Sequence, residues 1–378
     1  MPDLFDKTWI KSLELANRSV RSATWSGVAD ERGNVTDLAI DFYSELGRGG
    51  IGLIVTGYQF VMTNGQQLVY MMGNYEDGQV EGLRRLAAAI HEQGGKVVPQ
   101  IVHCGTRANP TFFREGDELW GPSAIPDPAS GNTPHEVTQE EITRLVEAYA
   151  AAARRAKEAG FDGVQLHGAH AYGINQFISG AWNQRGDAYG GSVKKRYRFL
   201  GEVLEAVRGA VDEDFPVMIK LNALDFLDRG LVPEEAVEIA RWLAEDGIDA
   251  IEVSAGSAAT RGGKSPSRTK IMKEEDEAYL ADLAALIKGA VKVPVIAVGG
   301  IRSPKKINAL LADGKADYVA LSRPFIREPH LINRWKSGDT SKATCISCNG
   351  CFETGLQGLG ISCRVERELK AKKEKKDA

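Results

Sequence analysis

Residues 162–200, DGVQLHGAHAYGINQFISGAWNQRGDAYGGSVKKRYRFL, form the stretch that decides the fold. The stretch opens with a short apolar run, 162–166, which predicts a buried strand. His167, His170 and Tyr172 follow this run and therefore leave the end of a strand together. In a barrel of alternating strands and helices, that end carries the chemistry. Polar loop residues are more often solvated than catalytic, so both roles stay open on these residues alone.

Short apolar runs recur along the chain, with helical stretches between them. The predicted strands are 18–23, 52–56, 96–101, 163–167, 217–221, 250–253, 295–298 and 318–321. The predicted helices include 81–92, 140–159, 195–211, 233–246 and 276–290. Eight strands that alternate with helices predict an α/β fold, a (β/α)8 TIM barrel. The long insertions after the third and fourth strands are expected to build the pocket.

The barrel pattern covers residues 1–338, and residues 339–378 are predicted to form a cysteine-rich appendage with a basic tail. The tail, ELKAKKEKKDA, is a terminal charge run that is expected to be solvated. Thr138 and Glu141 have the spacing of a capping box at the start of the helix at 140–159.

The composition is that of a soluble globular protein, because 43% of the 378 residues are hydrophobic and 26% are charged. The net charge of -4 and the lack of a basic stripe argue against a nucleic acid partner. No apolar run approaches ~18 residues, and the N-terminal MPDLFDKTWIKS lacks the apolar core of a signal peptide. We therefore expect no membrane association and a cytoplasmic location.

An anion site is predicted at the ends of the last two strands. The seventh strand, VIAVGGIRSP, carries Gly299 and Gly300 in a turn before a helix near Pro304, and the eighth ends with Ser322 and Arg323. Backbone amides at a glycine turn and an arginine favour negative charge. The loops after strands seven and eight of such barrels are the usual phosphate cradle. Ordinary turn glycines are the alternative, and these residues alone leave the two equal.

A buried cation is predicted in the fifth strand, where Lys220 stands in the apolar run VMIKLNA. A buried charge is unfavourable unless an anionic group receives it. We therefore expect Lys220 to face a group that is anionic or becomes so.

The stretch from His167 onward resembles the Old Yellow Enzyme family of FMN-dependent NAD(P)H oxidoreductases. The family signature His-x-x-His-Gly-Tyr, Gln-Phe-(Leu/Ile)-Ser and Asn-x-Arg-x-Asp-x-Tyr-Gly-Gly-Ser is met almost in full at 167–192. Ala171 replaces the usual glycine of the first block. The resemblance implies a (β/α)8 barrel that binds FMN and takes electrons from NAD(P)H. The cofactor-binding residues that it implies are Ala23, Thr24, Trp25, Gly57, Gln100, Lys220, Gly299, Gly300, Ser322 and Arg323.

Several of these positions have a defined place in the resembled family. Gln100 corresponds to the glutamine that hydrogen-bonds the pyrimidine edge of the isoalloxazine ring, with a buried structural role as the alternative. Lys220 corresponds to the cation near flavin N1 and O2, which stabilises negative charge on reduction. A gap-free correspondence puts Trp25, rather than Thr24, at the position that tunes the flavin. The amide of Gly57 is expected to reach the same edge of the ring.

The resemblance also assigns the substrate end. His167 and His170 correspond to the pair of N–H donors that grips the carbonyl or nitro oxygen of an activated alkene. Tyr172 corresponds to the proton donor to the α-carbon. The implied activity is reduction of α,β-unsaturated carbonyl-type small molecules, with NAD(P)H reducing the flavin first. Arg261, in a glycine-rich loop, is expected either to contact substrate or nicotinamide or to be solvated.

Four cysteines near the end of the chain have the spacing of a soft-metal site, Cys345-x2-Cys348-x2-Cys351-x11-Cys363. The segment resembles the [4Fe-4S] segment of the 2,4-dienoyl-CoA reductase and trimethylamine dehydrogenase branch, whose Cys-Ile-Gly-Cys-Asn opening is nearly repeated as Cys-Ile-Ser-Cys-Asn. A cluster would exchange single electrons with FMN. Zinc and a set of thiols without metal are the alternatives. Members of that branch continue into a nucleotide-binding domain, whereas this chain ends at Ala378, so a cluster is expected either to have an external electron-transfer protein or donor as its redox partner or to be a relic.

Three other functions remain open at this point. An amine dehydrogenase or demethylase of the same family would pass electrons through the cluster, although that branch typically has tyrosine where this chain has His167. A non-flavin barrel lyase would use Lys220 as a Schiff-base nucleophile. A pure electron carrier would hold flavin and cluster without an organic substrate. Barrels of the resembled family are often dimers or tetramers, so a homo-oligomer is expected.

Overall fold

The computed structural model describes residues 2–260 and 264–377. Eight parallel strands close into a barrel, and the last of them pairs back to the first. The barrel strands are β3 (Ser19–Arg21), β4 (Leu53–Phe60), β5 (Val97–Val102), β8 (Val164–Gly168), β9 (Val217–Asn222), β10 (Ala250–Ser254), β11 (Val295–Val298) and β12 (Tyr318–Leu321). Each predicted strand overlaps one of these, so the predicted (β/α)8 barrel is confirmed.

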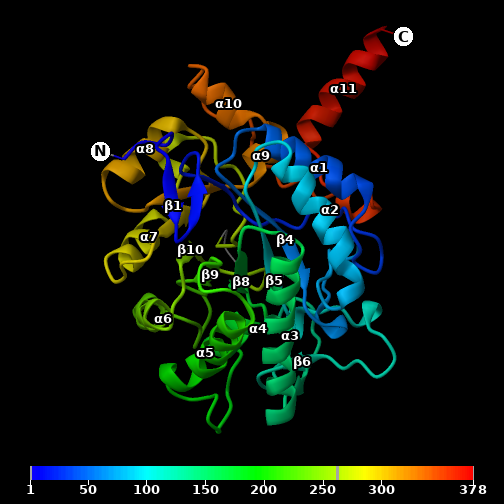
Figure 1. The fold of residues 1–378 in the computed structure, drawn as a ribbon, viewed down its shortest axis with the longest axis vertical. Helices are drawn as coiled ribbons and strands as arrows, with labels where there is room; N and C mark the ends of the chain where they lie inside the picture. The colour runs from blue at the N-terminus through cyan, green and yellow to red at the C-terminus, as the bar shows by residue number, and fades with distance from the viewer. Residues whose placement is uncertain (1, 261–263, 378) are drawn as a thin grey trace.

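Helices form a layer around the outside of the barrel (Figure 1). The helices of the described chain, including those that lie outside this layer, are α1 (Asp37–Arg48), α2 (Val80–His91), α3 (Gln139–Glu158), α4 (Gly173–Ile178), α5 (Val193–Ala210), α6 (Pro233–Glu245), α7 (Ala281–Lys288), α8 (Pro304–Ala312), α9 (Arg323–Arg327), α10 (Leu331–Lys336) and α11 (Arg364–Asp377). The strands β4, β5, β8, β9 and β10 are buried at every position. Helices cover the outer face of these strands and the barrel interior covers the other, so their sequences are continuous apolar runs.

One predicted helix differs from the observed one. The stretch predicted at 276–290 forms a 3-10 turn, η5 (Glu274–Asp276), followed by α7, which begins only at Ala281. Between them the carboxylate of Glu277 accepts hydrogen bonds from the amides of Arg302 (2.8 Å) and Ser303 (3.1 Å). These contacts hold Glu277 in an extended conformation, with φ of -72° and ψ of 153°, and so delay the helix.

A short antiparallel hairpin, β1 (Thr8–Ile10) and β2 (Leu13–Leu15), was not predicted, because three-residue strands leave no clear periodic pattern. Its apolar side chains pack against inward-facing residues of the barrel. The hydroxyl of Thr8 lies 3.0 Å from that of Tyr318, the first residue of β12. The hairpin therefore covers the end at which the barrel strands begin, and the opposite end is left for ligands.

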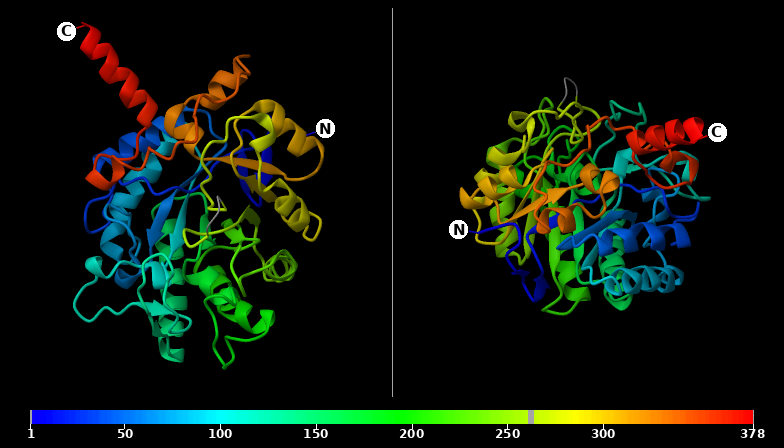
Figure 2. Two further views of the ribbon diagram at one scale, coloured as in Figure 1. Left: turned by 180° about the vertical axis from the view of Figure 1, so that it is seen from behind. Right: turned by 90° about the horizontal axis from the view of Figure 1, so that it is seen from above.

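The C-terminal segment returns to the barrel before the chain ends. The amides of Gly360 and Ile361 donate to the carbonyls of Gly27 (3.2 Å) and Ser26 (2.8 Å), just after β3. Beyond this contact α11 extends away from the barrel, and none of its residues is buried (Figure 2). Within the described residues, no helix combines the length and the apolar character that a membrane crossing requires.

The predicted capping box of α3 is confirmed. The chain just before this helix forms β7 (His135–Glu136), which pairs with β6 (Trp120–Gly121) in a two-stranded sheet. The Thr138 hydroxyl accepts from the Glu141 amide (3.2 Å), and the Glu141 carboxylate accepts from the Thr138 amide (2.7 Å). Two amides at the helix start that have no partner within the helix are thereby satisfied.

This capping box predicts a defined loss of stability on mutation. Thr138→Ala removes the oxygen that accepts from the Glu141 amide, so the free energy of unfolding should fall by about 1 kcal/mol. Thr143→Ala, at an exposed position of the same helix, is the control and should change it by less than about 0.5 kcal/mol. Denaturant unfolding measures both variants, and equal effects would contradict the role of the cap.

Candidate active site

A cavity of about 460 Å³ opens at the carboxyl ends of the barrel strands. The predicted site residues in its wall are Ala23, Thr24, Trp25, His170, Tyr172, Lys220, Gly299, Gly300, Ser322 and Arg323. They come from the ends of five strands or the loops that follow them, so the closed barrel brings together residues that are distant in the sequence. A cavity of this size holds a cofactor-sized ligand. Arg261 lies outside the described residues.

The glycine turn and Arg323 form one part of this wall. Gly299 and Gly300 have φ values of +126° and +70°, which residues with a side chain rarely adopt. A Cβ atom on Gly300 would lie 2.9 Å from the Tyr279 ring. Among the residues that the structure describes, the amides of Gly299, Gly300 and Arg323 meet no backbone acceptor outside regular helices and strands. Amides of this kind beside a guanidinium group match an anionic ligand such as a phosphate.

A second arginine stands at the same part of the wall and was not singled out from the sequence. Arg302 follows the glycine turn and is 4% exposed. Its Nη2 donates to the carbonyl of Ala343 (3.0 Å). The Nη1 atom of Arg323 donates to Asn349 Oδ1 (2.5 Å) and to the carbonyl of Arg268 (2.8 Å). Two guanidinium groups therefore favour negative charge in this part of the cavity.

The residues after β3 line the cavity in two different ways. The hydroxyl of Thr24 lies 2.5 Å from that of Ser322. The indole N–H of Trp25 donates to the Val69 carbonyl (3.2 Å), and its ring stacks on Phe352 at a centroid distance of 6.4 Å. Trp25 therefore offers an apolar face, because its one polar side-chain atom is already bonded. Its predicted role in tuning a flavin stays a prediction.

Lys220 has an anionic partner within the protein. Its Nζ lies 3.1 Å from Glu252 Oε1 and donates to the Ser22 hydroxyl (2.8 Å). The Lys220 side chain is 4% exposed and that of Glu252 is fully buried. The ion pair satisfies the buried cation and occupies the amine that a Schiff-base mechanism would need.

Gly57 and Gln100 are not part of the cavity wall. The Nε2 atom of Gln100 donates to Gln165 Oε1 (2.7 Å). The amide of Gly57 donates to the Tyr43 hydroxyl (2.7 Å), and its contact with a bound ring stays a prediction. A Cβ atom on Gly57 would lie 2.8 Å from the carbonyl of Thr24, and this close approach explains the glycine.

The two predicted histidines lie next to each other. Their ring centroids are 5.2 Å apart and their planes are nearly perpendicular. His167 ends buried behind the wall, whereas His170 reaches the cavity and its Nε2 lies 2.7 Å from Ser254 Oγ. The Ala169 amide donates to His167 Nδ1 (3.3 Å), so the Nε2 atom of a neutral His167 carries the hydrogen.

Both imidazoles are neutral at physiological pH. Burial lowers the pKa of His167 well below its ordinary value, and the neighbouring His170 and Lys220 lower it further. Burial, followed by Lys220 and Arg107, has the same effect on the pKa of His170. A neutral imidazole still has one N–H donor, so the pair can polarise an oxygen atom without carrying charge.

Tyr172 shares a hydrogen-bond acceptor with a second tyrosine. Its hydroxyl donates to Gln67 Oε1 (2.6 Å), and the hydroxyl of Tyr58 donates to the same oxygen (3.1 Å). Burial raises the pKa of Tyr172, so the phenol keeps its proton at neutral pH. Neither Tyr58 nor Gln67 was singled out from the sequence, since neither belongs to the motif that follows β8.

The four predicted cysteines surround a small hollow of about 20 Å³. Cys345 and Cys351 are buried, Cys363 is partly exposed and Cys348 is exposed, and none forms a disulfide. Burial raises the pKa of the Cys351 thiol to about 11. Arg323 lines both this hollow and the cavity, so one guanidinium group stands between the cysteines and the proposed phosphate position.

The spacing of the sulfur atoms bears on the kind of metal they could hold. One zinc ion with four thiolates at about 2.3 Å keeps its ligands within about 4 Å of one another. Within the described parts of the chain, the one group of three candidate ligand atoms that all lie within 4.8 Å of one another contains no cysteine. No three of the four sulfurs, all of which belong to described residues, lie within 4.8 Å of one another in this structure.

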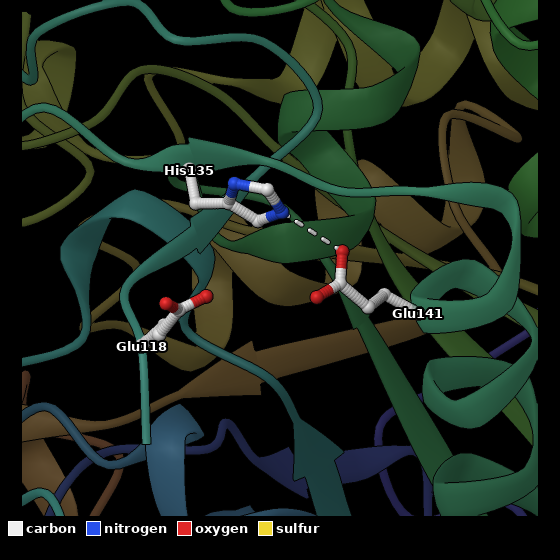
Figure 3. A group of neighbouring side chains, drawn as sticks. All are labelled: Glu118, His135 and Glu141. Atoms are coloured by element: carbon white, nitrogen blue, oxygen red, sulfur yellow. Dashed lines mark hydrogen bonds and ion pairs between the residues drawn. The ribbon is translucent and has the colours of Figure 1, made fainter. Parts of the chain in front are cut away.

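That other group consists of Glu118, His135 and Glu141 (Figure 3). Its contacts are explained without a metal ion. Glu141 Oε2 accepts from His135 Nε2 (3.0 Å) and from the Thr138 amide (2.7 Å) of the capping box. Arg144 lies 3.7 Å from the other carboxylate oxygen and already offers it a positive charge. We assign no metal to this group.

The chain has clear relatives among known proteins. A family described as NADH:flavin oxidoreductase / NADH oxidase matches residues 3–342. The chain is 36% identical over 369 residues to an NADH oxidase of Thermoanaerobacter brockii, covering 96% of this chain and 56% of the relative. It is 34% identical over 330 residues to an NADPH dehydrogenase of Clostridium acetobutylicum, covering 87% of this chain and 93% of the relative. The chain thus spans about half the length of the first relative and nearly all of the second.

A solved structure of a 2-naphthoyl-CoA reductase in complex with 2-naphthoyl-CoA has a similar fold. The TM-score is 0.87 at 29% sequence identity, and the match covers 96% of this chain and 56% of that chain. Because nearly the whole of this chain is covered, the likeness includes most of the cysteine segment as well as the barrel.

The buried histidines predict how stability depends on pH. Burial lowers the pKa of His103 to about 3, and the pKa values of His167 and His170 lie well below the ordinary one. The unfolded chain takes up protons at these side chains below about pH 6.5, whereas the folded chain does not. The free energy of unfolding should therefore be highest above about pH 6.5 and fall on acidification, by up to about 1.4 kcal/mol per pH unit for each histidine.

Denaturant unfolding between about pH 5 and about pH 7 measures this slope. In His103→Gln the unfolded chain binds one proton fewer. The free energy of unfolding should therefore change less steeply with pH, by up to about 1.4 kcal/mol per pH unit. An unchanged slope would contradict the buried, neutral state of His103.

Proposed function

The chain belongs to the NADH:flavin oxidoreductase / NADH oxidase family, and from this premise we propose that it is a flavin-dependent NAD(P)H oxidoreductase that reduces activated C=C bonds of α,β-unsaturated carbonyl-type substrates. One observation carries the proposal. His170 and the protonated Tyr172 line a cavity whose wall also includes a glycine turn and Arg323, and the neutral His167 lies behind this wall with its ring next to both of theirs. This combination provides oxygen-binding donors, a proton donor and an anion site in one place.

The chemistry of the cavity wall fits FMN. Gly299, Gly300 and Arg323 would hold the phosphate, since the amides of the turn and the guanidinium group favour an anion. Lys220 would meet the pyrimidine edge of the ring, and the family resemblance assigns Gln100, which is not part of the cavity wall, to the same edge. When bound, FMN supplies hydride transfer from NAD(P)H to the substrate.

The two histidines would bind the substrate oxygen. Their N–H groups stabilise the negative charge that develops on this oxygen as the double bond is reduced. In this structure His170 Nε2 lies 2.7 Å from Ser254 Oγ and His167 is buried behind the cavity wall, so both rings would turn toward the substrate oxygen in the complex. Because both rings are neutral, this binding should not change with pH in the neutral range.

Tyr172 would protonate the α-carbon. Its hydroxyl proton points to Gln67 in this structure and would turn to the substrate in the complex. An apolar part of the wall, made of Trp25, Leu68, Phe352 and Leu356, would exclude water from the reacting atoms and accept an apolar substrate.

Removing the Tyr172 hydroxyl tests this function. Tyr172→Phe should leave reduction of the flavin by NAD(P)H unchanged and slow reduction of a cyclic enone by about 100-fold or more, because general acid catalysis contributes about 10²–10⁴-fold. Stopped-flow measurement of the two half-reactions separates these effects. Tyr318→Phe, in which the lost hydroxyl lies at the opposite end of the barrel beside Thr8, is the control. Unchanged enone reduction by Tyr172→Phe would remove Tyr172 from this role.

We further propose that Cys345, Cys348, Cys351 and Cys363 hold a [4Fe-4S] cluster that exchanges electrons with the flavin and with an external electron-transfer protein. Two observations support a cluster: the four thiols surround a common hollow, and their spacing resembles that of the [4Fe-4S] segment of one branch of the family. A cluster with thiolate ligands carries negative charge, which the nearby Arg323 would stabilise.

Metal analysis tests the cluster. Protein purified without oxygen should contain about four irons per chain and show a brown absorbance that dithionite bleaches. Cys363→Ser should lose most of this iron. Cys104→Ser removes a buried cysteine that is not part of the hollow and should keep it. One zinc ion per chain, or no metal at all, would contradict the proposal.

We also propose that the protein acts in the cytoplasm, as its sequence composition predicts, and that it forms a homo-oligomer, as the family resemblance implies. The division at residue 338 stays a proposal. Residues on its C-terminal side, among them Ser347, Phe352 and Leu356, contribute to the cavity wall, so the segment would take part in binding rather than lie apart from the barrel.

A further inference from the structure

Glu252 is a buried carboxylate next to the cavity to which the proposed reaction assigns no role. It lies in the middle of β10, directly across the strand ladder from Lys220. Its Oε1 accepts from the Ser22 hydroxyl (2.6 Å) and lies 3.1 Å from Lys220 Nζ. Its Oε2 accepts from Gln165 Nε2 (3.0 Å). Every group around this carboxylate is therefore a donor, as an ionised carboxylate requires.

The contacts of Glu252 continue to Gln100 through one side chain. Gln165 uses its Nε2 for Glu252, so its Oε1 faces Gln100 and accepts from Gln100 Nε2 (2.7 Å). An ionised carboxylate can only accept, and this fixes which end of the Gln165 amide faces it. The orientation of Gln165 in turn fixes that of Gln100, which keeps its Oε1 and one N–H for other partners. We call the hydrogen-bonded series Glu252, Gln165 and Gln100 the relay. Glu252 thus decides which end of each amide in the relay donates and which accepts.

We propose that Glu252 is a positioning residue for the cofactor, which keeps Lys220 charged and sets the donor and acceptor pattern that Gln100 presents to the pyrimidine edge of the flavin. The inference rests on the proposed function, in which this edge lies against Lys220 and Gln100. The pyrimidine edge has carbonyl oxygens and one N–H group, so it needs both donors and an acceptor. The relay leaves Gln100 with one of each.

The charge of Glu252 has a separate consequence. The titratable groups that face Lys220 besides Glu252 are His167 and His170, and burial together with Lys220 keeps both neutral. Arg21, on β3, is the other charged group that Glu252 influences. Without the carboxylate, Lys220 would be a buried cation that has lost its ion-pair partner, and burial without a partner favours the neutral amine.

Loss of the Lys220 proton would change how the midpoint potential of bound FMN depends on pH. In the wild type, Lys220 is paired with Glu252 (3.1 Å), and the pH dependence of the midpoint potential of this protein is the reference. In Glu252→Gln, Lys220 would be neutral beside the oxidised ring and would take up a proton when reduction adds negative charge. The midpoint potential of bound FMN should then fall more steeply with pH, by up to one extra proton per two electrons.

Three variants separate the charge from the relay. Glu252→Gln removes the charge and lets the amides of Gln165 and Gln100 exchange their donor and acceptor ends. Gln165→Leu removes the hydrogen bonds of the relay and keeps the ion pair between Lys220 and Glu252. Asp317→Asn is the matched control, because Asp317 pairs with Lys288 (2.7 Å) and accepts from the Val295 amide (2.8 Å) at the end where the strands begin. Circular dichroism verifies that each variant is folded. FMN affinity is measured by fluorescence titration of the apoprotein, and the midpoint potential is measured across the neutral pH range.

Glu252→Gln and Gln165→Leu should each bind FMN about 10-fold to about 100-fold more weakly than the wild type, as expected for buried polar groups that lose a partner. Only Glu252→Gln should show the steeper pH dependence, and Asp317→Asn should match the wild type in both measurements. A wild-type slope in Glu252→Gln overturns the charge role, and wild-type affinity in Gln165→Leu overturns the relay. A wild-type protein that binds no FMN overturns the proposed function itself, which is a distinct outcome.

Discussion

Closure of the parallel barrel is the constraint on which the rest of the structure depends. Eight parallel strands that pair in a ring must all end on the same side, so the residues that follow each strand are forced to share one rim. The β1–β2 hairpin covers the opposite rim. Chemistry can therefore gather at one end only. There, the ends of β9, β11 and β12 bring Lys220, the Gly299–Gly300 turn and Arg323 to one cavity, and the loop after β8 adds His170 and Tyr172.

The second constraint is the burial of charge inside this barrel. Lys220 and Glu252 occupy neighbouring strands at paired positions, and each would be strongly unfavourable alone. Their pairing places a positive group in the cavity wall and leaves its compensating carboxylate behind the wall. A site built this way presents a fixed field to a ligand, because the charges are held by strands rather than by mobile loops.

Sequence patterns predicted the elements that depend on local signals. The barrel strands appear as continuous apolar runs because both of their faces are buried, and the motif after β8 marks the rim. Contacts between residues that are distant in the sequence leave no such signal, so Glu252, Gln67 and the bond between the Gly57 amide and Tyr43 were not predicted. Ala171 shows a local detail that sequence alone could not resolve. Its φ of +60° explains why the resembled family uses glycine there, and alanine accepts the strain.

The central claim is that FMN lies in this cavity with its phosphate at the glycine turn and its pyrimidine edge toward Lys220. A crystal structure of the protein loaded with FMN tests this claim most directly. The account predicts one FMN per chain, with phosphate oxygens within hydrogen-bond distance of Gly300 and Arg323 and the pyrimidine edge facing Lys220. An FMN bound elsewhere, or a ring turned so that its phosphate lies away from Gly300 and Arg323, would contradict it.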